Sequence, residues 1–296
     1  MSSAPTPEPV AERLPEWARK GSPLARGARE LRVLLRDQEL VTVCEEARCS
    51  NLGECFNRGT ATFMLSGARC TRRCGYCSIA TAKPLPLDEG EPERVAEAAA
   101  RLKLRYVVLT AVARDDLKDG GAGQFARTVE ALRARLPPAR IEVLTPDFQG
   151  RRASLECVLA AAPDIFNHNI EMAARLFAGL RPQGSYERSL EFLASIKQIR
   201  PGQVTKSGLM VGLGESDDEL AQVLRDLRAV GVEILTIGQY LRPTRQSAPV
   251  ARYVPPEQFL DYERQARELG FATVYSGVFV RSSFNAEGLA GRHGLA

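Results

Sequence analysis

Residues 62–77 read TFMLSGARCTRRCGYC, a short apolar segment followed by three closely spaced cysteines. Short runs of apolar, β-branched and aromatic residues are typical of buried strands. The cysteines are Cys70, Cys74 and Cys77, in the spacing C-x3-C-x2-C. We therefore expect a strand that ends in a loop, in which Gly75 lets the backbone turn so that three thiolates converge on one centre.

A short apolar segment followed by a helical segment recurs along the chain after this point. The further apolar segments span residues 106–109, 141–144, 165–167, 208–211 and 234–237, and residues 271–280 form another near the end. Strands that alternate with helices predict a parallel sheet with helical crossovers. Six such units can form a doubly wound sheet or a partly closed barrel, and periodicity does not choose between the two.

Two of the intervening segments have the period of an amphipathic helix. The residues that share one face are Phe125, Val129, Leu132 and Leu136 in the first, and Leu220, Val223, Leu224 and Leu227 in the second. Ser216 and Glu219 have the spacing of a capping box, which predicts the start of the second helix. Residues 83–92 are rich in proline and acidic residues, and we expect them to form a surface linker.

Composition places the chain among ordinary globular proteins. Of its 296 residues, 44% are hydrophobic and 26% are charged, which excludes a disordered or collagen-like chain. No apolar run approaches the roughly 18 residues of a transmembrane helix. The net charge of +4 comes from 40 basic and 36 acidic residues that are mixed along the sequence. Because they form no basic stripe, we expect neither a nucleic acid nor a membrane as a partner.

Cysteine usage is the unusual feature of the composition. Six of the seven cysteines lie between Cys44 and Cys77. Disulfide frameworks are typical of small secreted domains, whereas this chain is long and residues 1–32 contain no apolar signal segment. We therefore expect metal-bound thiolates in a reducing compartment, the cytoplasm. The seventh cysteine, Cys157, has helical surroundings and is expected to be a buried structural thiol.

The C-x3-C-x2-C triad restricts the metals that it could bind. Thiolates are soft ligands that suit zinc, copper(I) or iron–sulfur clusters. Structural zinc takes four protein ligands, so a zinc site here would need a distant fourth residue. Three cysteines leave one position open, as in a [4Fe-4S] cluster whose fourth iron binds another molecule. The placement of the triad at a strand end favours such a cluster over a zinc site.

A second triad precedes the apolar segment. Cys44, Cys49 and Cys55 form the spacing C-x4-C-x5-C. A disulfide pair with one spare thiol would account for these residues if they stood alone. Their closeness to the other triad makes a second metal-binding group the better interpretation.

The C-x3-C-x2-C spacing with Tyr76 before the last cysteine resembles the radical S-adenosylmethionine (SAM) superfamily. From about residue 40 to residue 286 the chain resembles the lipoyl synthase family within it. The matching stretches are residues 44–55, 61–65, 74–79, 114–117 with Gly120-Gly121, 166–171, 206–215, 238–244 and Arg281-Ser282-Ser283-Phe284. Departures from the family's pattern do not touch the cysteines: Ser50 replaces a proline, Phe56 a tryptophan and Phe284 a tyrosine.

The resemblance implies an α/β fold, a partial (β/α)6 TIM-like barrel. It implies three parts of the chain. Residues 1–59 would form an N-terminal extension that carries Cys44, Cys49 and Cys55. Residues 60–278 would form the radical SAM barrel, and residues 279–296 a short C-terminal tail with the Arg-Ser-Ser motif.

The resemblance also implies two [4Fe-4S] clusters. Cys70, Cys74 and Cys77 would hold the cluster whose open iron binds SAM. The other cluster would be an auxiliary one held by Cys44, Cys49, Cys55 and, as an oxygen ligand, Ser283. Arg281 and Ser282 would support that last ligand. A serine-ligated iron is labile, which suits a cluster that is dismantled as a source of sulfur.

Further residues are expected to contact SAM rather than metal. They are Tyr76, Gly120, Gly121, Asn169 and Glu171. His168 lies at the same strand end, and we interpret it as a hydrogen-bonded histidine and not as a metal ligand.

The activity implied is that of a radical SAM sulfurtransferase. It would insert two sulfur atoms at C6 and C8 of a protein-bound octanoyl-lysine, taking sulfur from the auxiliary cluster and using two SAM molecules per lipoyl group. Unactivated C–H bonds require a radical cofactor because side chains cannot remove such hydrogens as protons or hydrides.

The resemblance implies protein partners as well. They are octanoylated carrier domains of 2-oxoacid dehydrogenase acyltransferase subunits and of the glycine cleavage H protein, an electron donor such as ferredoxin or flavodoxin, and an iron–sulfur carrier that rebuilds the auxiliary cluster.

Two alternative functions share part of the pattern. Another sulfur-inserting radical SAM enzyme, a biotin synthase or a methylthiotransferase, has the C-x3-C-x2-C triad, but the close upstream triad and the Arg-Ser-Ser segment argue against both. A non-catalytic iron–sulfur carrier would need neither a six-unit barrel nor an open cluster.

Overall fold

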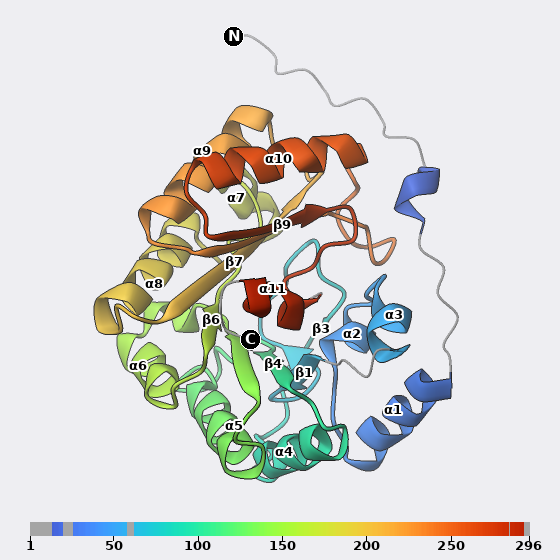
Figure 1. Ribbon diagram of the computed structural model, residues 1–296, viewed down its shortest axis with the longest axis vertical. Coiled ribbons are helices and arrows are strands. Elements are labelled where there is room, and N and C mark those ends of the chain that lie inside the picture. Colours follow the sequence, from blue (N-terminus) through green and yellow to red (C-terminus); the bar gives the residue numbers. More distant parts are fainter. Residues whose placement is uncertain (1–13, 20–25, 58–61, 284, 293–296) are drawn as a thin grey trace.

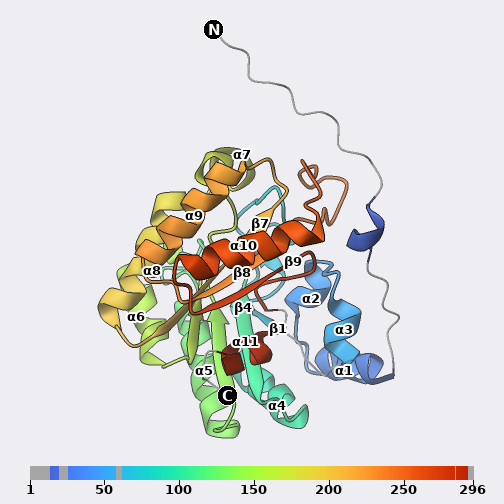
Figure 2. The same cartoon turned by 45° about the horizontal axis from the view of Figure 1, so that its top comes forward.

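A computed structural model describes residues 14–19, 26–57, 62–283 and 285–292, so Phe284 and most of the first 25 residues lie outside the described part. The strands follow one another around an arc with helices on its outer side, and α11 (Ala286–Arg292) lies inside it (Figure 1). The helices α1 (Arg26–Asp37), α2 (Val43–Glu46) and α3 (Leu52–Asn57) lie together at one side of the arc, near β1 (Figure 2). Within the described ranges, no helix is long and apolar enough to cross a membrane.

Seven parallel strands form the main sheet in the described part of the chain. They are β1 (Thr62–Leu65), β4 (Tyr106–Ala111), β5 (Arg140–Leu144), β6 (Ile165–Asn167), β7 (Val204–Val211), β8 (Ile234–Gln239) and β9 (Thr273–Gly277), paired in this order. A doubly wound sheet reverses its strand order partway, whereas here each neighbour follows in sequence. The fold is therefore a partial (β/α) barrel, and β9 adds a seventh strand to the six expected units.

Six longer helices of the described chain form the outer layer. They are α4 (Glu91–Arg101), α5 (Ala122–Arg135), α6 (Arg152–Ala160), α8 (Tyr186–Ile199), α9 (Asp217–Ala229) and α10 (Pro256–Glu268). Both expected helical faces turn inward, since the chosen residues of α5 and α9 are buried, apart from Leu136, which lies just beyond α5 and is half-buried. Ser216 and Glu219 form the expected capping box.

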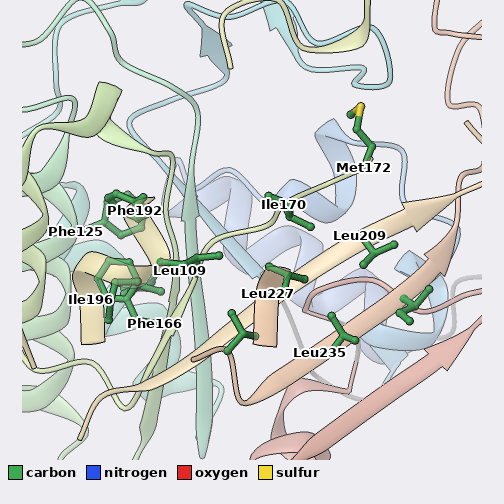
Figure 3. Close-up of a cluster of buried hydrophobic side chains, with 14 of the residues drawn as sticks. Leu109, Phe125, Phe166, Ile170, Met172, Phe192, Ile196, Leu209, Leu227 and Leu235 are labelled. Carbon is green, nitrogen blue, oxygen red and sulfur yellow. The ribbon is translucent and has the colours of Figure 1, made fainter. Parts of the chain in front are cut away.

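The main hydrophobic core lies between the strands and the outer helices (Figure 3). Phe166 on β6 and Phe192 on α8 lie with their ring centroids 6.0 Å apart, and Phe148 contacts the same Phe192 ring edge-on at 6.0 Å. Because alternate residues of a strand point to opposite faces, the remaining residues of each strand turn to the inside of the barrel.

The inside of the barrel contains a buried ion pair. Lys206 on β7 donates to both carboxylate oxygens of Glu142 on β5, at 2.9 and 3.0 Å, and both side chains are fully buried. The Tyr106 hydroxyl and the Asn167 amide also donate to Glu142, at 2.7 and 2.9 Å. Glu142 therefore accepts four hydrogen bonds, which offsets the cost of removing its charge from water.

A small apolar cluster next to this ion pair brings the C-terminal part of the chain into the barrel. It contains Tyr106, Val108, Ile165, Ile234 and Ala286. Ala286 is the first residue of α11, so this helix packs against the inward faces of β4, β6 and β8.

Two sequence-based expectations were wrong. Cys157 is exposed, because α6 buries the face that carries Ser154, Leu155, Val158 and Leu159. The linker expected over residues 83–92 ends earlier, since α4 begins at Glu91 and buries that side chain. The Glu91 carboxylate accepts the Ser66 backbone N–H at 2.9 Å and the Gln124 amide at 2.7 Å, so it ties α4 and α5 to the end of β1.

Removing the lysine of the buried ion pair should destabilise the barrel. Lys206→Met leaves Glu142 charged and buried without its counter-ion, so we expect a loss of about 3–5 kcal/mol in the free energy of unfolding. The double variant Lys206→Met/Glu142→Gln removes the charge and should recover much of this loss. Urea unfolding followed by circular dichroism measures both. An unchanged midpoint for Lys206→Met would show that the ion pair contributes no specific stability.

Candidate functional site

The loop that carries Cys70, Cys74 and Cys77 lies at the carboxyl ends of the strands. Backbone hydrogen bonds hold it at Gly75, whose N–H donates to the Leu180 carbonyl at 2.7 Å and whose carbonyl accepts the Ala248 N–H at 2.7 Å. A Cβ at residue 75 would lie 3.4 Å from the Leu180 side chain, so glycine leaves just enough room for this approach.

Arg72, between the first two cysteines of the loop, anchors it to the barrel. Its guanidinium donates to both carboxylate oxygens of Asp115, at 2.7 and 2.8 Å, and to Asp147 at 2.6 Å. Asp147 is fully buried and also accepts a hydrogen bond from Arg188 at 2.8 Å. Burial alone would raise the pKa of Asp147, but the hydrogen bonds and charge of Arg72 outweigh it and hold the pKa below its usual range. The loop is therefore held by bidentate ion pairing.

The three thiols of this loop line a cavity of about 270 Å³. Partial burial raises the pKa of the Cys74 thiol, and Cys77 is the exposed cysteine of the three. The Cys74 thiol is therefore protonated at neutral pH when no metal is bound, and metal binding there would displace its proton.

Asn169, Glu171 and Arg181 line the same cavity, as does Tyr76. Arg181 is buried over the ring of Phe177, 5.7 Å from its centroid, and donates to the Asn169 backbone carbonyl at 3.5 Å. Burial raises the pKa of Glu171, against the opposing effects of the Arg181 charge and a hydrogen bond from Asn169. A carboxylate, a guanidinium and a carboxamide together suit a zwitterionic ligand with an amino and a carboxylate group.

Three other residues named from the sequence have structural partners. His168 is buried, with Nδ1 2.8 Å from the Thr145 carbonyl and Nε2 3.2 Å from the Ser189 hydroxyl, so the interpretation as a hydrogen-bonded histidine is confirmed. Gly120 and Gly121 have φ of +65° and +89° and form the turn into α5. They are not among the residues that line the 270 Å³ cavity, and their positive φ accounts for glycine at both positions.

The other triad lines a small cavity of about 20 Å³ together with the C-terminal tail. The lining residues are Cys44, Cys49, Asn51, Cys55, Thr62, Arg281 and Ser283. Ser283 follows Cys55 by 228 positions (283 minus 55), yet both face this cavity. Burial raises the pKa of Cys44 to about 12.

Two glycines let the tail cross the barrel. A Cβ at Gly238 on β8 would lie 2.1 Å from the Val280 carbonyl oxygen, and one at Gly208 on β7 would lie 2.8 Å from the Ser282 hydroxyl. The Asn51 amide donates to the Phe279 carbonyl at 2.6 Å, which ties the tail to the extension. The tail therefore runs directly against the backbones of β7 and β8.

A larger cavity of about 850 Å³ shares lining residues with both sites. It is lined by Tyr76, Cys77 and Glu171, which also face the first cavity, and by Cys49 and Arg281, which also face the second. One cysteine of each triad therefore faces this larger cavity.

The donor set fits soft metals. All seven cysteines are free thiols, and thiolates suit iron–sulfur clusters. No group of three His, Cys, Asp or Glu residues that could hold a single metal ion is found within the described ranges.

Sequence reasoning missed the residues that position the cysteine loop. Arg72 lies inside the C-x3-C spacing and Asp115 lies in residues 114–117, one of the stretches that carry the family resemblance. The sequence did not show that these two residues form an ion pair. Asp147 lies in the loop after β5 and Arg181 follows the short helix α7 (Phe177–Leu180), and nothing in the sequence marked either residue as buried.

The chain resembles known proteins over most of its length. Residues 64–227 match the model of the Radical SAM superfamily. A lipoyl synthase of Rubrobacter xylanophilus is 52% identical over 92% of this chain and 85% of that protein. A lipoyl synthase of Methylococcus capsulatus is 53% identical over 93% of this chain and 86% of that protein. The chain belongs to the lipoyl synthase family.

This lipoyl synthase family member is accordingly a radical SAM enzyme, and that superfamily implies SAM and a [4Fe-4S] cluster. Solved structures agree with the fold. Methylornithine synthase superposes with a TM-score of 0.57 at 14% identity, over 83% of this chain and 74% of that one. SuiB of Streptococcus suis, bound to SAM, gives 0.53 at 10% identity, over 74% and 50%. At such low identity these likenesses support the partial barrel alone.

A methyl group at position 238 should displace the tail. In Gly238→Ala the new Cβ overlaps the Val280 carbonyl, so the tail must shift. We expect trypsin to cut after Arg281 about tenfold faster than in the unmodified protein, since overpacking of this kind costs roughly 1–3 kcal/mol. Mass spectrometry of timed digests measures the rate. The matched control is Gly179→Ala, where nothing lies within 4 Å of the added Cβ. Equal rates for both variants would contradict the close contact.

Proposed function

We propose that this chain inserts two sulfur atoms at C6 and C8 of an octanoyl group carried on a lysine of a protein domain, with the sulfur taken from an auxiliary [4Fe-4S] cluster. The observation that carries the proposal is the 850 Å³ cavity, which is lined by one cysteine of each triad, Cys49 and Cys77. An acyl chain in this cavity would have one triad on each side.

The proposed metal ligands are divided between the two sites. Cys70, Cys74 and Cys77 would hold the [4Fe-4S] cluster that binds SAM, and Cys44, Cys49, Cys55 and Ser283 would hold the auxiliary cluster. When bound, the first cluster and SAM supply the one-electron chemistry that removes hydrogen atoms from unactivated C–H bonds. Because cysteine binds a cluster as the thiolate, cluster binding at both sites must release protons.

Polar residues of the first cavity would orient SAM. The Glu171 carboxylate and the Asn169 carboxamide suit an amino group and hydroxyls, while the Arg181 guanidinium suits a carboxylate. Tyr76 lines both this cavity and the larger one, so its ring would separate SAM from the acyl chain. We propose no SAM contact for Gly120 and Gly121, which do not line this cavity.

The larger cavity would position the acyl chain and exclude water. Its apolar lining includes Met210, Tyr240, Leu241 and Tyr253. Tyr240 is buried and its hydroxyl donates to the Ala248 carbonyl at 2.8 Å, so its ring is fixed. Fixed apolar walls hold the reacting carbon close to both sites and keep solvent from a reactive intermediate.

The proposal assigns roles to the three parts of the chain and to its partners. The extension (residues 1–59) would supply three auxiliary-cluster ligands, the barrel (60–278) the SAM site, and the tail (279–296) the fourth ligand. Substrates would be octanoylated domains of 2-oxoacid dehydrogenase acyltransferases and of the H protein. Ferredoxin or flavodoxin would supply electrons, and an iron–sulfur carrier would rebuild the auxiliary cluster, all in the cytoplasm.

Removing one triad at a time should separate SAM cleavage from sulfur transfer. Cys44/Cys49/Cys55→Ala should keep about half the iron and still form 5′-deoxyadenosine, but give no lipoyl product from an octanoyl-lysyl peptide. Cys70/Cys74/Cys77→Ala should keep about half the iron and form no 5′-deoxyadenosine. Anaerobic iron analysis and mass spectrometry of the products measure these outcomes. Cys157→Ala, at the exposed cysteine outside both triads, is the control and should match the unmodified protein. Lipoyl product from the first variant would contradict the proposed sulfur source.

The role of Ser283 can be tested with two substitutions. Ser283→Ala should abolish lipoyl formation and lower auxiliary iron, because one iron loses its oxygen ligand. Ser283→Cys should restore the iron, since thiolate is the softer and stronger ligand, yet slow sulfur release because that iron is held more firmly. Iron content and single-turnover product yield distinguish the two variants. Normal turnover in both would show that Ser283 is not a ligand.

A further inference from the structure

A hydrogen bond joins the tail to the 270 Å³ cavity of Cys70, Cys74 and Cys77, called the SAM cavity below for its proposed ligand. The Ser282 hydroxyl donates to the Asn169 side-chain oxygen at 2.8 Å, across 113 positions of sequence. Asn169 follows β6 and lines the cavity that contains Cys70, Cys74 and Cys77. Ser282 lies between Arg281 and Ser283, which both line the cavity of the other triad. Adjacent residues of the tail therefore face different sites: Ser282 contacts the 270 Å³ cavity, and Arg281 and Ser283 line the cavity of the other triad.

The space for this hydrogen bond exists because residue 208 is glycine. A Cβ at Gly208 would lie 2.8 Å from the Ser282 hydroxyl and 2.9 Å from the Asn169 side-chain oxygen. It would also lie 2.6 Å from the Thr236 hydroxyl of β8. Polar atoms from three separate segments thus meet where β7 carries no side chain.

The bond ties the end of the Asn169 side chain to the tail. Its oxygen is occupied by the Ser282 O–H, and its amide N–H donates to the Glu171 carboxylate. A hydroxyl can donate or accept, whereas a carboxylate only accepts, so the Glu171 carboxylate determines which branch of the carboxamide carries the N–H. Ser282 holds the end of the Asn169 side chain in place beside Glu171, at the wall of the 270 Å³ cavity.

We propose that Ser282 is a positioning residue that orients Asn169 for SAM binding, and so makes the SAM site depend on a seated tail. This inference rests on the proposed role of the Cys70–Cys77 cavity as the SAM site. It gives the two serines of the tail different tasks, Ser283 toward the auxiliary cluster and Ser282 toward the SAM cavity.

The decisive measurement is the affinity for SAM, determined by equilibrium dialysis on anaerobically reconstituted protein without an octanoyl substrate. Ser282→Ala should raise the Kd for SAM about fivefold, as expected for one lost partly buried hydrogen bond, while auxiliary iron stays unchanged. The matched control is Ser276→Ala on β9, which removes a buried hydroxyl for which no partner is found in the described part of the chain. This control should leave the Kd unchanged.

A tail-anchoring role would give a different result. If Ser282 only held the tail in place, Ser282→Ala would lose auxiliary iron at an unchanged Kd for SAM, and that outcome would overturn the proposal. Absence of lipoyl product at a fivefold raised Kd would instead count against the proposed function, because SAM binding is measured separately.

A double-mutant cycle tests whether the two residues act through their hydrogen bond. Asn169→Ala alone should weaken SAM binding at least as much as Ser282→Ala. The double variant should be no weaker than Asn169→Ala, since without the carboxamide the serine has nothing to orient. Independent, multiplicative effects on the Kd would refute the positioning role.

Discussion

Contact between the C-terminal tail and the bare backbones of β7 and β8 is the constraint on which the site depends. Any side chain at Gly238 would occupy the place of the Val280 carbonyl, and any at Gly208 would displace Ser282. Because both positions are glycine, the tail enters the barrel mouth and Ser283 reaches the cavity of Cys44, Cys49 and Cys55. The contact between the tail and the segment that carries Cys44, Cys49 and Cys55 therefore depends on glycine at positions 208 and 238.

Buried charge at the two ends of the barrel serves different purposes. At the carboxyl ends of the strands, Arg72 with Asp115 and Asp147 immobilises the loop of Cys70, Cys74 and Cys77. Inside the barrel, Lys206 with Glu142 joins β7 to β5, which are not neighbours in the sheet. In both cases the carboxylates accept several hydrogen bonds, and loss of one partner would cost more than the pair contributes.

The sequence predicted local features well and long-range pairings poorly. Strand positions, the faces of α5 and α9 and the Ser216 capping box follow from periodicity and spacing, and the structure confirms them. Periodicity could not distinguish a barrel from a doubly wound sheet, because that choice depends on strand order. The partners of Arg72 could not be predicted, since they lie 43 and 75 positions away. Cys157 was placed wrongly because a short helix with apolar residues on two sides leaves its buried face ambiguous.

The position of Ser283 has a consequence for synthesis of the protein. The cavity of Cys44, Cys49 and Cys55 is completed by a residue translated 228 positions later than Cys55. At roughly 5–20 residues per second, the ribosome needs about 10 to 45 s to cover that distance. Until then the cavity of these three cysteines lacks the wall that Arg281 and Ser283 supply. The cavity is therefore completed late in synthesis of the chain, long after the three cysteines have been incorporated.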